Sequence, residues 1–63
     1  MKRYCLAVVG EETDMVVPLT FHTHWTKAGA NMAVARLNAK RDGHTTHFAT
    51  WDRRKRRLVD AQL

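Results

Sequence analysis

The stretch RYCLAVVGEETDMVVPLTF, residues 3–21, holds two runs of alternating side chains on either side of a short polar segment. In the first run the larger side chains fall at every second position, at Tyr4, Leu6 and Val8, and the second run repeats this from Met15 to Phe21. A period of two is the period of a β-strand. Residues 10–14, GEETD, are turn formers, so the sequence predicts a β-hairpin from strands over residues 3–9 and 15–21.

Pro18 lies inside the second of these strands. Because proline has no N–H to donate to a neighbouring strand, it is confined to edge strands and bulges. The second strand is therefore predicted to be an edge of the sheet. An apolar edge is open to pairing with another chain, which makes a homodimer through the edge near Pro18 a possibility.

A helix is predicted over residues 27–41. Thr26 is a suitable N-cap, with Thr23 as the alternative, and Gly43 could end the helix in a left-handed conformation. An apolar stripe with helical spacing follows the cap, and it consists of Ala30, Ala33, Val34 and Leu37. We expect Ala33, Val34 and Leu37 to pack on the sheet. Their expected partners are Leu6, Val8, Val17, Leu19 and Phe48.

Alternation returns over residues 44–51, and a short strand is predicted over residues 57–61. The expected order is thus ββαββ, an α+β fold in which one helix packs on one face of a small antiparallel or mixed sheet. We expect residues 1–63 to form a single domain. A chain of this length buries only about 60% of the surface of its unfolded form, which leaves room for a thin core.

That thin core disfavours an enzyme, because a deep active-site pocket would consume it. Cys5 is the single cysteine and lies in an apolar strand, where a thiol usually behaves as a small hydrophobic group. No intrachain disulfide can form, and a reducing cytoplasm, that of a bacterial host, is the simplest location. The apolar runs are far too short for a signal peptide or a membrane span. We expect no catalytic residues and no membrane association.

The four histidines occur as two pairs, His22 with His24 and His44 with His47. Imidazole is a common zinc ligand, so the pairs raise the question of a metal site. If strand three runs parallel to strand two, however, the two pairs lie at opposite ends of the sheet. We therefore expect no metal site and no cofactor, although His22 and His24 could form a two-ligand surface site with a partner.

The formal charge of +5 comes from one segment. Residues 53–57 carry five of the eleven Lys and Arg residues, and the remaining six are balanced by six acidic residues. Five adjacent like charges repel one another, and an anionic partner would relieve this repulsion. The predicted partner-binding residues are Arg53, Arg54, Lys55, Arg56 and Arg57, together with Trp51, which adjoins them and is of a type enriched at interfaces.

Three features of the chain are shared with a known family: Lys2-Arg3-Tyr4 at the first strand, Val17-Pro18-Leu19 in the second, and an alanine-containing helix followed by an arginine-bearing strand. In these the chain resembles the small bacteriophage-encoded inhibitors of host RNA polymerase. The resemblance implies a small sheet with one helix and late-strand arginines that bind an acidic patch of the polymerase. Arg53 and Arg54 would be the counterparts. The helix of that family is strongly acidic, whereas this one carries Lys27, Arg36, Lys40 and Arg41.

Two hypotheses follow for the function. In the first, the chain is a non-enzymatic phage- or mobile-element-type regulator that binds an acidic patch of a host protein of the nucleic-acid machinery, for example RNA polymerase. In the second, it is a nucleic-acid-binding module in which residues 53–57 contact phosphates while Trp51 or Tyr4 stacks on a base. Charge alone does not separate the two.

Overall fold

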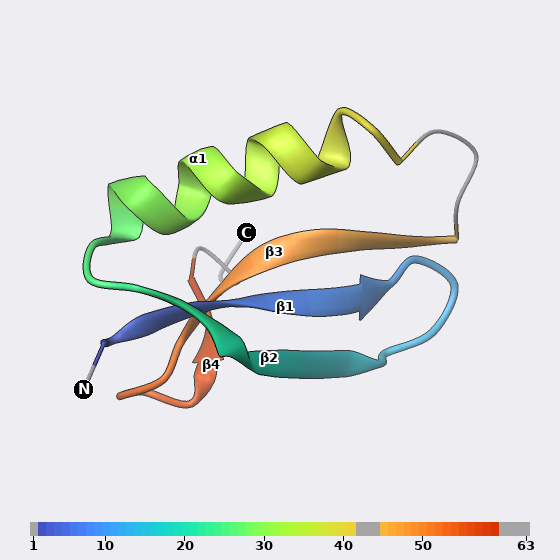
Figure 1. The fold of residues 1–63 in the computed structure, drawn as a ribbon. Helices are drawn as coiled ribbons and strands as arrows, with labels where there is room; N and C mark the ends of the chain where they lie inside the picture. Colours follow the sequence, from blue (N-terminus) through green and yellow to red (C-terminus); the bar gives the residue numbers. More distant parts are fainter. Residues whose placement is uncertain (1, 42–44, 60–63) are drawn as a thin grey trace.

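The computed structural model describes residues 2–41 and 45–59. Strands β1 (Tyr4–Gly10) and β2 (Val16–His24) are followed by helix α1 (Lys27–Asn38) and then by strands β3 (Thr46–Asp52) and β4 (Arg57–Leu58). The strands form one sheet in the order β2-β1-β3-β4, in which every neighbouring pair is antiparallel. The predicted α+β class is confirmed, and the sheet is antiparallel throughout its pairs (Figure 1).

The first hairpin forms as predicted, with β2 at an edge of the sheet. Gly10 donates its N–H to the Met15 carbonyl (2.9 Å), and because hydrogen-bonded and non-bonded pairs alternate in an antiparallel ladder, the nitrogen of Pro18 lies on the free edge. The register shifts between Cys5 and Leu6, so that residues 20–22 form a bulge. A proline and a bulge both oppose edge pairing, and a homodimer through this edge stays a prediction.

Helix α1 begins where the sequence predicts and ends earlier. Thr26 is the N-cap, and its hydroxyl accepts the N–H of Gly29 (3.1 Å). The helix ends at Asn38 rather than at Arg41, since the N–H groups of Lys40 and Arg41 bond the carbonyls of Leu37 and Asn38, three residues back (3.1 Å each), and do not continue the α-helical pattern. The Asn38 side chain bonds the main chain of Phe48 in both directions, at 2.9 and 2.7 Å. Gly43 lies outside the described residues.

The helix packs along β3 rather than over the centre of the sheet (Figure 1). Among the helix residues, Ala30 is fully buried, whereas Ala33, Val34 and Leu37 are half-buried. The expectation that Val17 joins the core is wrong, since its side chain is 45% exposed. Strand β2 is the strand farthest from the helix in the sheet order, so α1 does not reach far enough to cover it.

The core is as thin as the chain length implies. In the part of the chain that the structure describes, four apolar residues have no exposed surface: Cys5, Leu6, Ala7 and Ala30. Three of them lie on β1, the strand with a long neighbour on each side. No helix in the described part of the chain has the length and apolar character needed to cross a membrane.

Candidate anion-binding surface

The predicted basic residues occupy the turn between β3 and β4, and a buried carboxylate organises that turn. Asp52 is 5% exposed, and its side chain accepts the backbone N–H groups of Arg54 (3.0 Å) and Lys55 (3.2 Å). The Asp52 carbonyl accepts the N–H of Arg56 (2.7 Å). Arg54, Lys55, Arg56 and Arg57 are all exposed. The turn is thus fixed by one acidic residue while its cations face solvent.

Asp52 also ties the turn to the start of the chain. Its two oxygens accept the Nε and Nη2 groups of Arg3, at 3.2 and 2.9 Å. The hydrogen bond from Arg3 is the largest influence that holds the pKa of Asp52 down, at about 2. A bidentate pair of this kind fixes both the position and the orientation of the guanidinium group.

Arg53 makes the second connection between the two segments. Its backbone N–H donates to the Arg3 carbonyl (2.8 Å), and its guanidinium donates to the Lys2 carbonyl (3.0 Å). Lys2, Arg3, Arg53 and Arg54 together line an open cleft of about 390 Å³. We call this the basic cleft. The sequence does not predict Lys2 and Arg3 as site residues, because only the pairing of β1 with β3 brings residues 2 and 3 beside residue 53.

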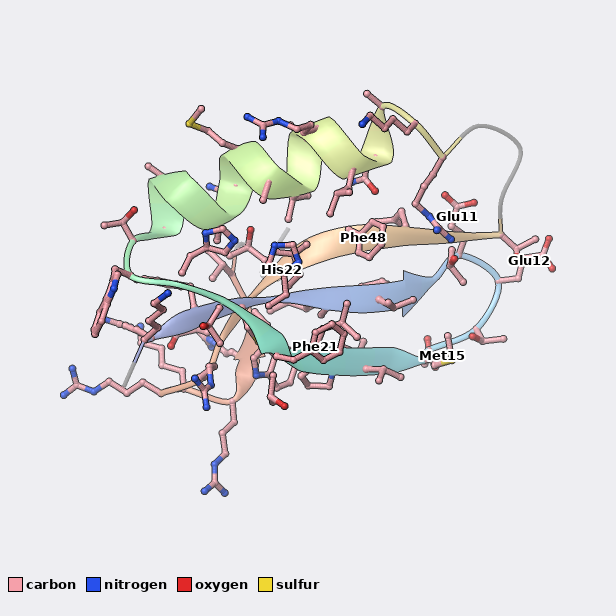
Figure 2. All side chains as sticks on the ribbon, in the orientation of Figure 1. Glu11, Glu12, Met15, Phe21, His22 and Phe48 are labelled. Atoms are coloured by element: carbon pink, nitrogen blue, oxygen red, sulfur yellow. The ribbon has the colours of Figure 1, made fainter. Side chains whose placement is uncertain are left out.

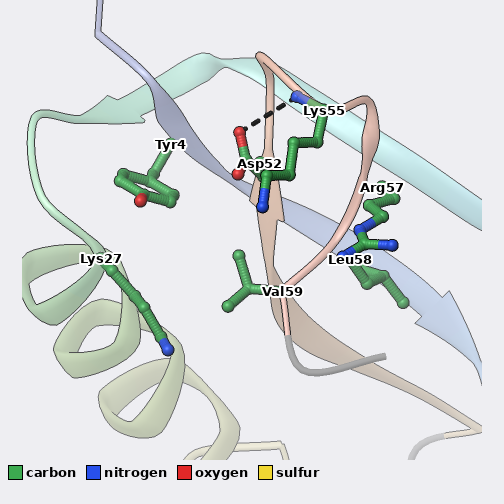
Figure 3. Close-up of a pocket in the computed structure, with 7 residues that line it drawn as sticks. All are labelled: Tyr4, Lys27, Asp52, Lys55, Arg57, Leu58 and Val59. Carbon is green, nitrogen blue, oxygen red and sulfur yellow. Dashed lines mark hydrogen bonds between the residues drawn. The ribbon is translucent and has the colours of Figure 1, made fainter. Parts of the chain in front are cut away.

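A second cleft, of about 280 Å³, lies between the helix start and the same turn (Figure 3). Its lining includes the cations Lys27, Lys55 and Arg57, with Tyr4 and the Asp52 carboxylate, and it is closed by Leu58 and Val59. The β3–β4 turn therefore presents positive charge on two sides. We use the name basic end for the seven cations that the turn and the chain start hold together: Lys2, Arg3, Arg53, Arg54, Lys55, Arg56 and Arg57.

Of the two tryptophans, the one predicted to bind the partner is the less exposed. Trp51 lies within β3, opposite Cys5 of β1 and Leu58 of β4, and is half-buried. Trp25 is the exposed tryptophan, with 67% of its surface accessible. The Lys2 ammonium lies over the Trp25 ring, 5.9 Å from its centroid, so the exposed indole adjoins the basic cleft. Strand pairing half-buries Trp51, and its predicted part in partner binding stays a prediction.

The cysteine and the histidines are the other candidate site residues. Burial raises the pKa of the Cys5 thiol, so this cysteine is held in its weakly nucleophilic form. His24 pairs with Tyr4 at one end of β1 and His47 with Val9 near the other, so these two histidines are separated as predicted. His44 lies outside the described residues. Among residues 2–41 and 45–59, no three His, Cys, Asp or Glu side chains are grouped to hold a metal ion.

The fold and this surface together describe a small α+β chain with a basic end that is held in place by Asp52. Comparison with protein-family models, with curated proteins and with solved structures finds no match for the chain.

Proposed function

We propose that this chain is a non-enzymatic nucleic-acid-binding protein that contacts phosphates through its basic end. One observation carries the proposal: four cations from two segments about fifty residues apart in sequence are held around one cleft, and an exposed tryptophan adjoins it. Phosphate contacts from Lys and Arg supply most of the affinity for nucleic acid, and aromatic side chains add base stacking.

The electrostatics of the basic end support a polyanionic partner. Within the described residues, its seven cations surround one buried carboxylate, Asp52, which is already bonded to Arg3 and to the turn. The exposed cations therefore repel one another across the turn, and phosphates would remove that repulsion. Planar guanidinium groups also match phosphate oxygens in a bidentate geometry.

The backbone of the turn gives a second line of support. Arg56 has a φ of 57°, the left-handed conformation that glycine and asparagine adopt most easily. An arginine at such a position lowers the stability of the turn, and strained residues gather at functional sites. We therefore attribute the arginine at position 56 to binding rather than to folding.

The test compares two double variants with the same loss of charge. Arg54→Ala/Arg56→Ala removes two exposed cations of the basic end, and Arg36→Ala/Lys40→Ala removes two exposed cations of the helix region. The first variant should bind a short oligonucleotide more weakly. The negative slope of log affinity against log salt should become shallower by about 0.7 to 0.9 for each lost contact. The second should bind nearly as the unaltered chain does. Equal effects of the two variants would show that net charge, and not the basic end, governs binding.

A second candidate is a regulator that binds an acidic patch of a host protein of the nucleic-acid machinery, such as RNA polymerase. The observation that favours it is the separation of charge. The β1–β2 turn carries exposed Glu11, Glu12 and Asp14 at the end of β1 opposite the basic end, so the chain can match a partner with charges of both signs. A bacterial protein that stays bound after nuclease treatment, and that Arg54→Ala/Arg56→Ala releases, would favour this candidate.

A further inference from the structure

Among the large apolar residues that the structure describes, Trp25 is notable because its side chain is both exposed to solvent and in contact with a cation. It lies between the end of β2 and the N-cap Thr26, and it is 67% exposed. A tryptophan that is buried removes roughly 150–250 Å² of surface from water, which would stabilise a chain with so thin a core. Because Trp25 is exposed, it does not contribute this stabilisation.

The local structure does not require an indole at this position. The helix start is fixed by the Thr26 hydroxyl, which accepts the N–H of Gly29, and not by the Trp25 side chain. Within the described residues, the Trp25 ring lies against the ammonium of Lys2, a residue that also lines the basic cleft. The indole is therefore linked to the cation cluster rather than to the core.

We propose that Trp25 is a stacking platform for an unpaired base, so that the preferred ligand of the basic end is single-stranded nucleic acid. The inference rests on the nucleic-acid-binding function proposed above and deepens it. Lys2 lies over one face of the indole, and the exposed fraction of Trp25 leaves room for a base against the ring. The phosphates that flank this base then lie at the guanidinium groups of Arg53 and Arg54, in the cleft that Lys2 also lines.

The preference for single strands over duplexes follows from the geometry of the bases. In a duplex both faces of an internal base are covered by its neighbours, so a protein ring can stack only on the bases of single strands, loops and ends. Away from its two ends, a duplex can use the cations of the basic end but not Trp25. The chain should therefore hold single strands more tightly than duplexes of equal length, and the difference should disappear with the indole.

The experiment measures the affinity of a labelled oligothymidylate and of a duplex of the same length by fluorescence anisotropy. Trp25→Ala should weaken single-strand binding by about 5- to 150-fold, the range found for loss of one stacked base, and should leave duplex binding unchanged. Trp25→Phe keeps a smaller ring and should restore part of the loss. Met32→Ala is the control, because Met32 is a second large exposed apolar residue (64%) and lies on the helix.

A spectroscopic measurement separates stacking from an indirect effect on the fold. In a Trp51→Phe background, Trp25 is the remaining tryptophan of the sequence, and its fluorescence should be quenched by the oligothymidylate but not by the duplex. Equal quenching by the two ligands, or no loss of single-strand affinity in Trp25→Ala, would overturn the stacking inference. In that case Arg54→Ala/Arg56→Ala would still weaken both ligands, and the proposed function would stand. Absence of binding to either ligand would overturn both proposals.

Discussion

At the scale of single residues, Asp52 links the start of the chain to the basic turn. Its carboxylate accepts the guanidinium of Arg3 and two N–H groups of the turn that carries the cations. Its side chain is 7% exposed while that of Arg3 is 37% exposed, so the acid is buried and the cation remains partly available. One acidic residue can thus hold several cations in place without neutralising them all.

The charged state of Asp52 should make folding depend on acid pH. The hydrogen bond from Arg3 lowers the folded-state pKa to about 2, below the value of the unfolded chain. A depressed acid pKa stabilises the fold above the unfolded pKa of about 3.9, and this contribution is lost as the pH falls through the folded pKa. The urea midpoint should therefore fall between about pH 4 and pH 2, and Asp52→Asn should be less stable than the unaltered chain at neutral pH.

The control for this prediction is Asp14→Asn, which removes an exposed carboxylate of the β1–β2 turn. The difference in urea midpoint between Asp52→Asn and the unaltered chain should shrink toward zero as the pH approaches 2, whereas Asp14→Asn should show little difference at any pH. A difference for Asp52→Asn that stays constant down to pH 2 would show that the Asp52 charge does not stabilise the fold.

At the scale of elements, the helix holds β3 along the part of its edge that β4 does not cover. Strand β4 pairs with Trp51 and Asp52, and within residues 2–41 and 45–59 the earlier part of β3 has no strand neighbour on that side. The Asn38 side chain both donates to the Phe48 carbonyl and accepts the Phe48 N–H. The Thr50 hydroxyl donates to the Asn31 side chain farther along. The helix thus supplies side-chain hydrogen bonds to this edge of β3.

Asn38→Ala should remove both bonds and leave two main-chain groups of Phe48 without partners. The expected loss is about 1–3 kcal/mol of unfolding free energy for each group that cannot regain a partner from water. Lys40→Ala, an exposed site just past the helix, should change stability by less than about 0.5 kcal/mol. Chemical denaturation of the two variants measures the difference. If Asn38→Ala matched the control, water would have to satisfy this edge of β3 as well as the side chain does.

These elements also show how far the sequence predicts the structure. The hairpin over β1 and β2, the edge position of β2 and the helix start at Thr26 follow from local signals: a period of two, a proline and a cap. The early end of the helix does not follow from local signals, because the tighter main-chain bonds of Lys40 and Arg41 are seen only in the folded structure. A helix over residues 27–41 was a reasonable expectation from its pattern alone.

The candidate site could also be predicted from the sequence only in part. The five consecutive cations from Arg53 onward stand out in the sequence because of their local charge. The contributions of Arg3 and Trp25 depend on strand register and on the position of the chain between β2 and α1, which no local signal reveals. A surface assembled from distant segments can be recognised only after the sheet order is known.

At the scale of the whole molecule, β1 separates charges of opposite sign. Its first residue, Tyr4, pairs with Asp52 beside the basic turn, and its last residue, Gly10, leads into Glu11 of the acidic turn. Figure 2 shows Glu11 and Glu12 together at the far end of the sheet. Seven residues of strand span about 20 Å. That distance is about two Debye lengths at 0.1 M salt, so the two ends act independently under physiological conditions.

The variant Glu12→Gln/Asp14→Asn tests this independence, and it spares Glu11, whose carboxylate lies 3.6 Å from the His47 imidazole. Removal of two distant negative charges should raise the affinity for an oligonucleotide at low salt, where the Debye length reaches about 30 Å at 0.01 M. At 0.15 M salt the affinity should change by less than about twofold, because screening shortens the Debye length to about 8 Å. The dependence of log affinity on log salt should therefore steepen slightly, because affinity is gained at low salt and not at 0.15 M, although no phosphate contact is added. A tenfold change at 0.15 M salt would instead mean that the ligand touches the acidic turn. A rise of that size would mean that the bound oligonucleotide reaches the acidic turn and is repelled by it in the unaltered chain, so the two ends would not act independently.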